Sequence, residues 1–515
     1  MDQSVVSEFE LAISVDDAVS AWFEGDFEHC LSLCDRLDAQ GRGSRQTGLL
    51  RARALLRLDR APEALELLEA LHPEDRSTDG EFTRRLLLGA ALTRVDDPVR
   101  ALEILQQTKA EMQCAHPAVQ SEVALNIGLA WYALRELDAA DAALDEVLPI
   151  SDIIHARSLE YKGWIASARG DYGVAPAHFI AALERLEECT HYDRFLEANC
   201  LQALGHLATD GLDRTAWQPV CSRRETMKWG AGGLDKPRFS LALSAASFEN
   251  DVEGRPLEAA IEARRACDLA PTPAYRAQAL CKRASIAHSA GERIAHADHL
   301  QAAVDAFKST EIEALSGNEM LVPLVMAGEL ANGGRAAQAR WYFDRYRDPC
   351  STPQTLVITG DYRRATYELL VAAQIAEAEG RCADAVAQYR DVARRSVHGA
   401  LRDAVIASIR IAALTGGAGI LPQYVAATAH DVKPSSWMYA TLKDIDKTKT
   451  ISGLTALQRE YLEMVSKGYT NPHIAKMRGR SIHTVRNHVA DLFSSFGVKT
   501  RTELAKEYLR VVRSN

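Results

Sequence analysis

Small and apolar residues recur along most of the chain in a pattern that predicts paired helices. The clearest example is residues 163–182, GWIASARGDYGVAPAHFIAA, in which Gly163 and Gly170 are followed by Tyr172 and Phe179. Small residues let two antiparallel helices approach closely, the Gly-Asp turn reverses the chain, and aromatic side chains fill the space between the helices. This stretch therefore predicts a helical hairpin.

The same pattern recurs in weaker form at seven other places. The segments are 23–34, 56–68, 93–105, 133–148, 253–271, 332–343 and 379–390. A small residue follows the turn at each of the eight places, at Cys30, Ala64, Ala101, Ala140, Ala175, Ala259, Ala339 and Ala385. No strand-like alternation interrupts the series, which predicts an all-α fold of stacked hairpins.

Residues 15–420 resemble tetratricopeptide repeats, whose period is about 34 residues. The resemblance is good at 163–182 and at 254–271, where Pro271 matches the closing proline of the family, and it is loose at 205–250 and 285–330. It implies a solenoid over residues 1–429, because one repeat cannot bury its own apolar face and neighbours stack into a superhelix with a concave groove. Such grooves usually bind a peptide, a helix or another protein.

The inner helices of the middle repeats carry a set of amide, aromatic and basic residues that we expect to face the groove. They are Asn126, Tyr132, Arg157, Tyr161, Trp164, Asn199, Gln202 and His206. Amides and aromatics suit a peptide backbone, and an arginine suits its carboxylate. Packing between helices is the alternative role that the sequence leaves open for these residues.

The repeat pattern ends at residues 430–453, HDVKPSSWMYATLKDIDKTKTISG, whose proline, serines and mixed charges predict a linker over 430–450. Residues 451–515 then read as a small helical domain. We expect a first helix capped by Thr455 and ending near Lys467 and Gly468. A second helix is capped by Asn471, with Pro472 after the cap, and is followed by a tight turn at Gly479. Ser481 caps the third helix. Two short helices joined by a three-residue glycine turn predict a helix-turn-helix.

The helix after this turn separates an apolar stripe from a polar face. At 100° per residue, Val485, Val489, Leu492 and Phe496 share one side and predict the core. The opposite side and its edge suit a DNA major groove, because Arg pairs with guanine, Asn pairs with adenine and Ile contacts a thymine methyl. The expected DNA contacts are Ile482, His483, Arg486 and Asn487 at bases, and Arg480, Thr484, His488, Lys499 and Arg501 at phosphates.

Residues 454–504 resemble the LuxR-type helix-turn-helix domain, whose pattern LT..E...L....G..N..IA...G.S..TV..H.......GV..RTEL this chain follows closely. The departures are Gln458 in place of a usual glutamate, and Arg478 and Arg480 in place of a usual leucine and isoleucine. We expect Met477 to fill the resulting gap while both arginines reach water or phosphate. The resemblance also implies a homodimer on DNA, with a seam at Tyr508, Leu509 and Val512. Closing the four-helix core is the alternative role that the sequence leaves open for these residues, and we expect it of Leu504.

Charge divides the chain in the same way. Residues 451–515 hold 11 Lys and Arg against 5 Asp and Glu, a net charge of +6, whereas residues 1–450 hold 49 against 65, a net charge of −16. An acidic body with a basic tail indicates that only the tail meets a polyanion. Ten cysteines without a CxxC pair, no signal pattern and no membrane-length apolar stretch favour a cytoplasmic protein.

The motif survey favours a regulator over an enzyme. P-loop, HEXXH, GxSxG and dinucleotide-binding motifs are absent from the sequence, GAGGLDKP at 230–237 reads as a loop, and we expect His296 and His299 to be solvated or capping residues. The sequence therefore predicts a DNA-binding transcriptional regulator without a cofactor. Its expected partners are double-stranded DNA, a protein or peptide in the groove, and RNA polymerase. The alternative is an interaction scaffold whose tail does not read DNA.

Overall fold

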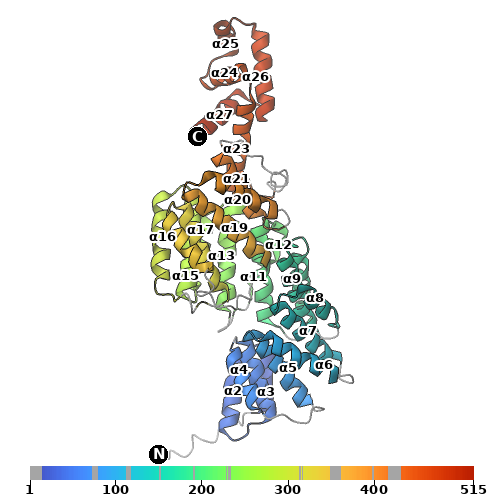
Figure 1. The fold of residues 1–515 in the computed structure, drawn as a ribbon. Coiled ribbons are helices and arrows are strands. Elements are labelled where there is room, and N and C mark those ends of the chain that lie inside the picture. Colours follow the sequence, from blue (N-terminus) through green and yellow to red (C-terminus); the bar gives the residue numbers. More distant parts are fainter. Residues whose placement is uncertain are drawn as a thin grey trace, which may run out of the picture.

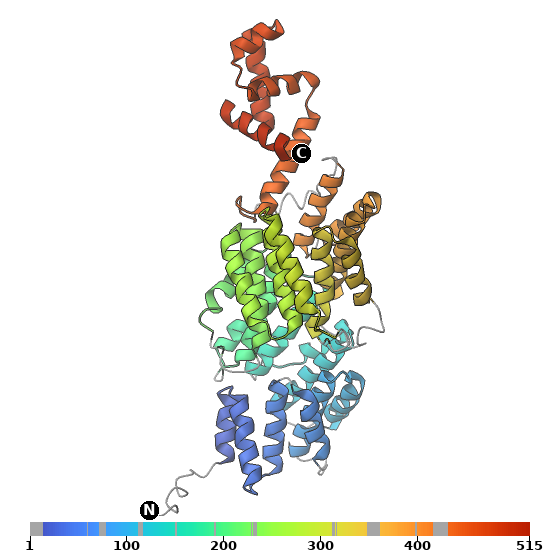
Figure 2. The same ribbon diagram turned by 90° about the vertical axis from the view of Figure 1, so that its left-hand side faces the viewer.

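The computed structural model describes residues 14–514 apart from 59, 72–78, 112–116, 150–151, 190–191, 228, 230–233, 312–314, 316, 348–360, 397–398 and 416–430. Every regular element in this described part is a helix, which confirms the all-α prediction. The helices form a curved stack of hairpins, and the last four helices make a separate domain at the end of the molecule opposite the first repeats (Figures 1 and 2).

Ten helix pairs follow one another in the described part of the body. They are α1 (Val15–Phe23) with α2 (Phe27–Ala39), α3 (Arg45–Arg57) with α4 (Ala61–Ala70), α5 (Asp79–Arg94) with α6 (Pro98–Glu111), α7 (Pro117–Ala133) with α8 (Leu137–Asp145), α9 (Asp152–Arg169) with α10 (Ala175–Glu187), α11 (Arg194–Gly211) with α12 (Arg214–Arg223), α13 (Asp235–Phe248) and its π-helical extension η1 (Glu249–Glu253) with α14 (Pro256–Leu269), α15 (Pro273–Ser289) with α16 (Arg293–Phe307), α17 (Val322–Asn332) with α18 (Ala336–Arg347), and α19 (Asp361–Ala378) with α20 (Cys382–Arg395). A short 3-10 helix, η3 (Gly317–Leu321), precedes α17, and α21 (Leu401–Leu414) follows the last pair.

The eight small residues predicted to follow the turns occupy one structural position. Each lies in the first turn of the second helix of its pair, and each has an exposed fraction of 0%. In the α9–α10 pair, a Cβ built on Gly163 would lie 2.7 Å from the Phe179 ring, so glycine is what lets this ring fill the space between the helices. The predicted hairpins are confirmed, and these contacts give their physical reason.

Two pairs carry a large residue at the same position, which explains why the repeat resemblance is loose there. The position is Trp217 in α12 and His296 in α16, and both side chains are buried. Trp217 stacks on Phe248 with ring centroids 4.5 Å apart, and the His296 ring lies 4.9 Å from that of His288. His296 therefore packs between helices and is not the solvated or capping residue that we expected. The part of the chain that the structure describes contains no cluster of three or more metal-ligating side chains.

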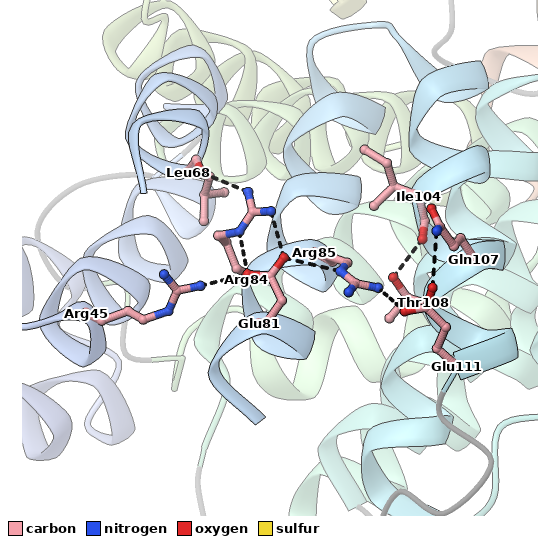
Figure 3. A network of polar contacts seen from close by, with 9 residues as sticks. All are labelled: Arg45, Leu68, Glu81, Arg84, Arg85, Ile104, Gln107, Thr108 and Glu111. Atoms are coloured by element: carbon pink, nitrogen blue, oxygen red, sulfur yellow. Dashed lines mark hydrogen bonds and ion pairs between the residues drawn. The ribbon is translucent and has the colours of Figure 1, made fainter. Parts of the chain in front are cut away.

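A buried ionic network joins the second and third pairs (Figure 3). Glu81 of α5 is 2% exposed and accepts hydrogen bonds from Arg45 of α3 at 2.8 Å, Arg84 at 2.8 and 3.0 Å, and Arg85 at 3.3 Å. Arg85 also donates to Glu111 at the end of α6 at 2.6 Å. One carboxylate thus holds three guanidinium groups from two adjacent repeats, and periodicity gives no sign of this pairing.

The last repeats fold back onto the middle ones. Helix α19 packs against α9, and α21 packs against α11 (Figure 1). Tyr362 of α19 meets Tyr172 edge-on at 5.8 Å, and Arg363 forms an ion pair with Asp210 of α11. The superhelix therefore closes on itself and surrounds a central cavity.

The predicted linker at 430–450 is mostly helix. Ser436 caps α23 (Trp437–Gly453), which runs from the body to the terminal domain (Figure 2). Met438 has an exposed fraction of 0%, and the Trp437 indole donates to Asp251 of η1 at 2.9 Å. The proline and the serines mark the entry to this helix and do not mark a flexible connector. Because α23 is docked at its start, it is a firm joint between the body and the tail.

Candidate functional site

The central cavity has a volume of about 1380 Å³ and is lined by helices from α1 to α21. All eight predicted groove residues lie in its wall, and each is half-buried. Tyr132 and Tyr161 meet edge-on at 6.0 Å. Two amides are held by neighbours, because Asn126 donates to the Glu122 carbonyl at 2.8 Å and Gln202 donates to Ser240 at 3.2 Å. The structure brings these residues together, and their binding role stays a prediction.

Charged residues that the sequence analysis missed also line the cavity. At one end, Arg57 pairs with Asp193 at 2.6 Å, and Glu160 is 4% exposed. Burial raises the pKa of Glu160 to about 7, although the charge of Arg157 and hydrogen bonds from Asn199 and Trp164 oppose this rise. Burial likewise lowers the pKa of His206 well below its usual value, so this imidazole is neutral at neutral pH.

At the other end of the cavity, positive and negative side chains are more nearly equal in number. Arg402 pairs with Asp251 at 2.7 Å, and burial raises the pKa of the neighbouring Asp403 to about 7. Lys282 is half-buried in the same wall, and its pKa is lowered by burial and by the charge of Arg402. Each cation at this end faces an acid, since the charges of Asp251 and Glu329 both act on Lys282. Acidic residues on inward-facing helix positions were the available signal for this arrangement.

The terminal domain contains four helices around its own apolar core. They are α24 (Ala456–Ser466), α25 (Asn471–Arg478), α26 (Ile482–Phe496) and α27 (Arg501–Ser514). The core includes the predicted stripe of Val485, Val489, Leu492 and Phe496, and Leu504 closes it with an exposed fraction of 0%. Helix α23 contributes Ile451 to this core. The domain is thus one packed unit at the end of α23.

The predicted helix boundaries hold, with one correction. Thr455 forms a capping box with Gln458, so glutamine performs the task of the usual glutamate there. Ser481 caps α26, and Gly479 has a left-handed φ of 59° between α25 and α26. The cap of α25 is Thr470, whose hydroxyl accepts from the His473 backbone at 3.4 Å, and not Asn471. Asn471 is the first residue of the helix because threonine satisfies the same orphan N–H.

The face of α26 opposite its core is open and polar. Ile482 is 44% exposed, and His483, Arg486 and Asn487 are exposed. Within the described residues, none of the last three side chains has a hydrogen bond or ion pair. Asp491, one turn further along, is also exposed, so the basic character belongs to the first two turns of the helix.

Comparison with known proteins matches this domain to one family. Residues 452–507 match the family described as "Bacterial regulatory proteins, luxR family". Residues 452–507 are a LuxR-type helix-turn-helix domain. The chain is also 36% identical over 72 residues to the "Putative HTH-type transcriptional regulator YhjB" of Escherichia coli (strain K12), a match that covers 14% of this chain and 34% of that protein.

Other similarities are partial or distant. The chain is 30% identical over 110 residues to histidinol-phosphate aminotransferase of Geotalea uraniireducens (strain Rf4), covering 21% of this chain and 30% of that protein. It thus spans about a third of the length of these curated relatives. Among solved structures, a Rap protein complexed with competence and sporulation factor gives a TM-score of 0.38 at 13% identity, covering 65% of this chain and 98% of that one. The APC/C hetero-tetramer Cut9–Hcn1 gives 0.25 at 12% identity, covering 84% and 92%.

The two unusual arginines of the LuxR-type domain fit without a buried charge. Arg478 pairs with Glu460 of α24, and Arg480 is exposed, so both reach the surface as expected. Met477 does not fill the space beside them, since it is 54% exposed. The ion pair across α24 and α25 replaces the apolar contact that a leucine would make.

Two predicted phosphate contacts have roles inside the LuxR-type domain. Arg501 donates to the Asn471 side chain at 2.7 Å and to the Tyr469 carbonyl, which ties the start of α27 to the loop before α25. His488 is half-buried and stacks on Tyr461 with centroids 4.9 Å apart. Both residues therefore hold the domain together in the arrangement that the structure shows.

The remaining predicted phosphate contacts are accessible to different degrees. Arg480 and Lys499 are exposed. Thr484 is half-buried, and its hydroxyl lies 2.8 Å from the hydroxyl of Ser481, the cap of α26. Lys476 of α25 is also exposed, and the sequence analysis missed it. Its place in the last turn before Gly479 was the available signal.

The predicted dimer seam is only partly open. Leu509 is 41% exposed, but Tyr508 is half-buried against the domain core. The side chain of Val512 lies outside the described residues.

Over the described part of the chain, no helix combines the length and the apolar character that a membrane span needs.

Proposed function

We propose that the protein is a DNA-binding transcriptional regulator whose LuxR-type domain places α26 in the major groove. The observation that carries this proposal is the open face of α26. Arg486 and Asn487 can each make a bidentate contact with a base edge, and Ile482 offers an apolar contact to a thymine methyl. His483 begins the same face. Because these side chains make no bond within the described part of the chain, no internal contact has to break before they meet DNA.

Basic side chains around this face supply the contacts with DNA phosphates. Arg480 lies in the turn before α26, Lys499 precedes α27, and Lys476 lies in the last turn of α25. Each is exposed, and each contact with a phosphate releases counterions, so affinity should fall as salt rises. The net charge of +6 over residues 451–515 attracts DNA to the LuxR-type domain, whereas the body, which carries −16, repels it.

We further propose that the body binds a protein segment or peptide in its cavity and that this binding controls the LuxR-type domain. Aromatic rings, amides and charged groups line the cavity, which is the mixture that recognises an extended peptide. Its volume of about 1380 Å³ exceeds that of typical small-molecule pockets. A homodimer formed through Leu509 completes the proposed DNA complex.

A short chain of contacts leads from the cavity wall to α23. Arg402 lines the cavity and donates to Asp251 at 2.7 Å, and the other oxygen of Asp251 accepts from the Trp437 indole at 2.9 Å. The Asp251 carbonyl also accepts from Ser436, the cap of α23, at 2.5 Å. A ligand that displaces Arg402 therefore alters the support of the helix that carries the LuxR-type domain, which is a physical route for control.

The test of DNA reading uses the full chain and a DNA fragment enriched from genomic fragments. Arg486→Ala should weaken binding to that fragment by about 1–3 kcal/mol and relax one base preference. The control is Arg394→Ala, which removes the same charge from an exposed position on α20 and should leave the affinity unchanged. An equal loss on every DNA sequence would make Arg486 a phosphate contact. No loss would remove α26 as the reading element and favour the scaffold function.

A further inference from the structure

The outer surface of the body carries an apolar patch on two neighbouring repeats. Leu257 and Ile261 of α14 are 78% and 68% exposed, and Ile294 of α16 is 79% exposed. In the part of the chain that the structure describes, these are the three most exposed large apolar side chains. Large apolar residues that gather on one surface and face water mark a contact with another molecule.

The three residues occupy related outer positions of their repeats. Leu257 lies two residues before Ala259, and Ile294 lies two residues before His296, which takes the same repeat position in α16. Ile261 lies one helical turn after Leu257, so the two share one side of α14. At this level the cavity wall comes from α13, α15 and α17, and α16 lies at the outer edge of the body (Figure 1). The patch is therefore separate from the cavity.

Unpaired charges flank the patch. Arg264 follows Ile261 on the same side of α14, and Asp298 follows Ile294 on the same side of α16. Glu258 and Arg293 lie at the start of α14 and α16, beside the apolar residues. These four charged side chains are exposed, and within the described residues none of them has a hydrogen bond or an ion pair. Along α14 the acid precedes the base, whereas along α16 the base precedes the acid.

We propose that this patch binds the same patch of a second copy of the chain, so that two bodies pair around a two-fold axis parallel to α14 and α16. Such an axis sets α14 of one protomer beside α16 of its partner, with both helices running in the same direction. Leu257 then lies opposite the partner's Ile294. The apolar side chains leave water on both protomers at once, which is the driving force for the contact.

The opposite order of the charges makes the patch complementary to itself. Counted from the common repeat position, Arg264 lies five residues on and Asp298 two, so the partners differ in height by about 4.5 Å, which an arginine side chain spans. Glu258 and the partner's Arg293 differ by two residues, about 3 Å. An antiparallel arrangement would instead bring acid toward acid and arginine toward arginine, which repel each other.

The size of the patch also favours a second copy. A standard interface buries about 800 Å² on each partner, and three aliphatic side chains supply only a part of this area. The rest comes from polar surface, so the partner must present charges of both signs in the matching order, as α14 and α16 themselves do. We expect a reversible dimer with a dissociation constant in the micromolar range. This contact is separate from the seam at Leu509 and needs no DNA.

Sedimentation velocity of the full-length chain without DNA tests the contact. The chain should shift from monomer to dimer as its concentration rises from about 1 to about 100 µM. Ile261→Glu should raise the dissociation constant about tenfold or more, because it places a charge against apolar side chains. Val99→Glu is the matched control: Val99 is 58% exposed and lies two residues before Ala101 in α6, the same repeat position as Leu257. It should leave the dissociation constant unchanged.

Charge reversal tests how the two patches are paired. Arg264→Asp and Asp298→Arg should each weaken the dimer, because each sets like charges against each other across the interface. The double variant exchanges the two charges without removing either, so it should restore the wild-type dissociation constant. A protein other than a second copy would give no such rescue. Unchanged melting temperatures show that each variant is folded.

The outcomes decide between this contact and others. A chain that stays monomeric up to about 100 µM would overturn the inference. A dimer that persists in Ile261→Glu but is lost in Leu509→Glu would assign association to the LuxR-type domain and would also overturn it. Loss of the dimer in both single charge variants without rescue in the double variant would contradict the pairing of α14 with α16. The DNA-binding proposal stands on its own test in each case.

Discussion

Gly254 lies where the body meets α23, and replacing it with alanine should open this joint. Gly254 has a φ of 66°, a left-handed conformation that favours glycine. A Cβ at this position would lie 2.2 Å from the backbone carbon of Ser435 and 2.2 Å from the backbone nitrogen of Ser436. Backbone atoms cannot rotate away as a side chain can, so the segment before α23 has to move.

The contacts of that segment set the magnitude. Three hydrogen bonds hold it to η1: from the Lys433 backbone to Val252 at 2.8 Å, from Ser435 to Glu253 at 2.8 Å, and from Ser436 to Asp251 at 2.5 Å. Their loss costs about 1 kcal/mol each, exposure of Met438 adds about 2, and the left-handed alanine adds about 1. Gly254→Ala should therefore weaken the docking of α23 by about 4–6 kcal/mol.

Hydrogen exchange measured by mass spectrometry tests this directly. Peptides covering residues 433–442 should lose protection in Gly254→Ala, while peptides from α26 keep theirs because the LuxR-type domain has its own core. Gly291→Ala is the control, since Gly291 has a φ of 77° with nothing within 4 Å of an added Cβ. It carries the same backbone strain without the clash. Equal protection of residues 433–442 in the two variants would refute the account of the joint.

Two further predictions concern buried carboxylates. Burial raises the pKa of Glu160 from 4.5 to about 7, so the folded state binds this proton more tightly than the unfolded state. The stability contributed by Glu160 is fully present below pH 4.5 and is lost as the pH rises through 7, a loss of about 3 kcal/mol. Denaturant titrations at pH 5 and pH 8 should show Glu160→Gln gaining about this much relative to wild type, and a constant difference would contradict the burial argument. Glu81→Gln removes the shared partner of three arginines and should lower the stability of the first repeats by about 3–5 kcal/mol. Chemical denaturation should show this loss, and Glu63→Gln, which breaks only the exposed pair with Arg60, should leave the stability nearly unchanged.

Local sequence patterns predicted the parts of the fold that depend on local packing. The small residues from Cys30 to Ala385 mark hairpins because each must fit in the same space between two helices. The pattern was weak where Trp217 or His296 occupies that space, since a large residue there is accommodated by partners that periodicity does not identify. The helix-turn-helix was predicted closely because its caps and turn are determined by neighbouring residues.

Long-range features lay beyond the sequence pattern. The pairing of Arg363 with Asp210 joins α19 to α11, and it brings the last repeats back onto the middle ones around the cavity. The structural role of Arg501 depends on Asn471, 30 residues earlier in the chain. The helical form of the segment between body and tail was not predicted, because the start of α23 is stabilised by contacts with η1, about 180 residues before it. Such contacts follow from how the repeats curve, which a single repeat does not reveal.

The central claim is that the LuxR-type domain reads DNA within the full chain. The most direct measurement is enrichment of genomic DNA fragments by the full-length protein at two salt concentrations, followed by sequencing. The account predicts a family of related sequences with two-fold symmetry, whose affinity falls steeply with salt as phosphate contacts are screened. Failure to enrich any related sequence at either salt concentration would contradict the claim.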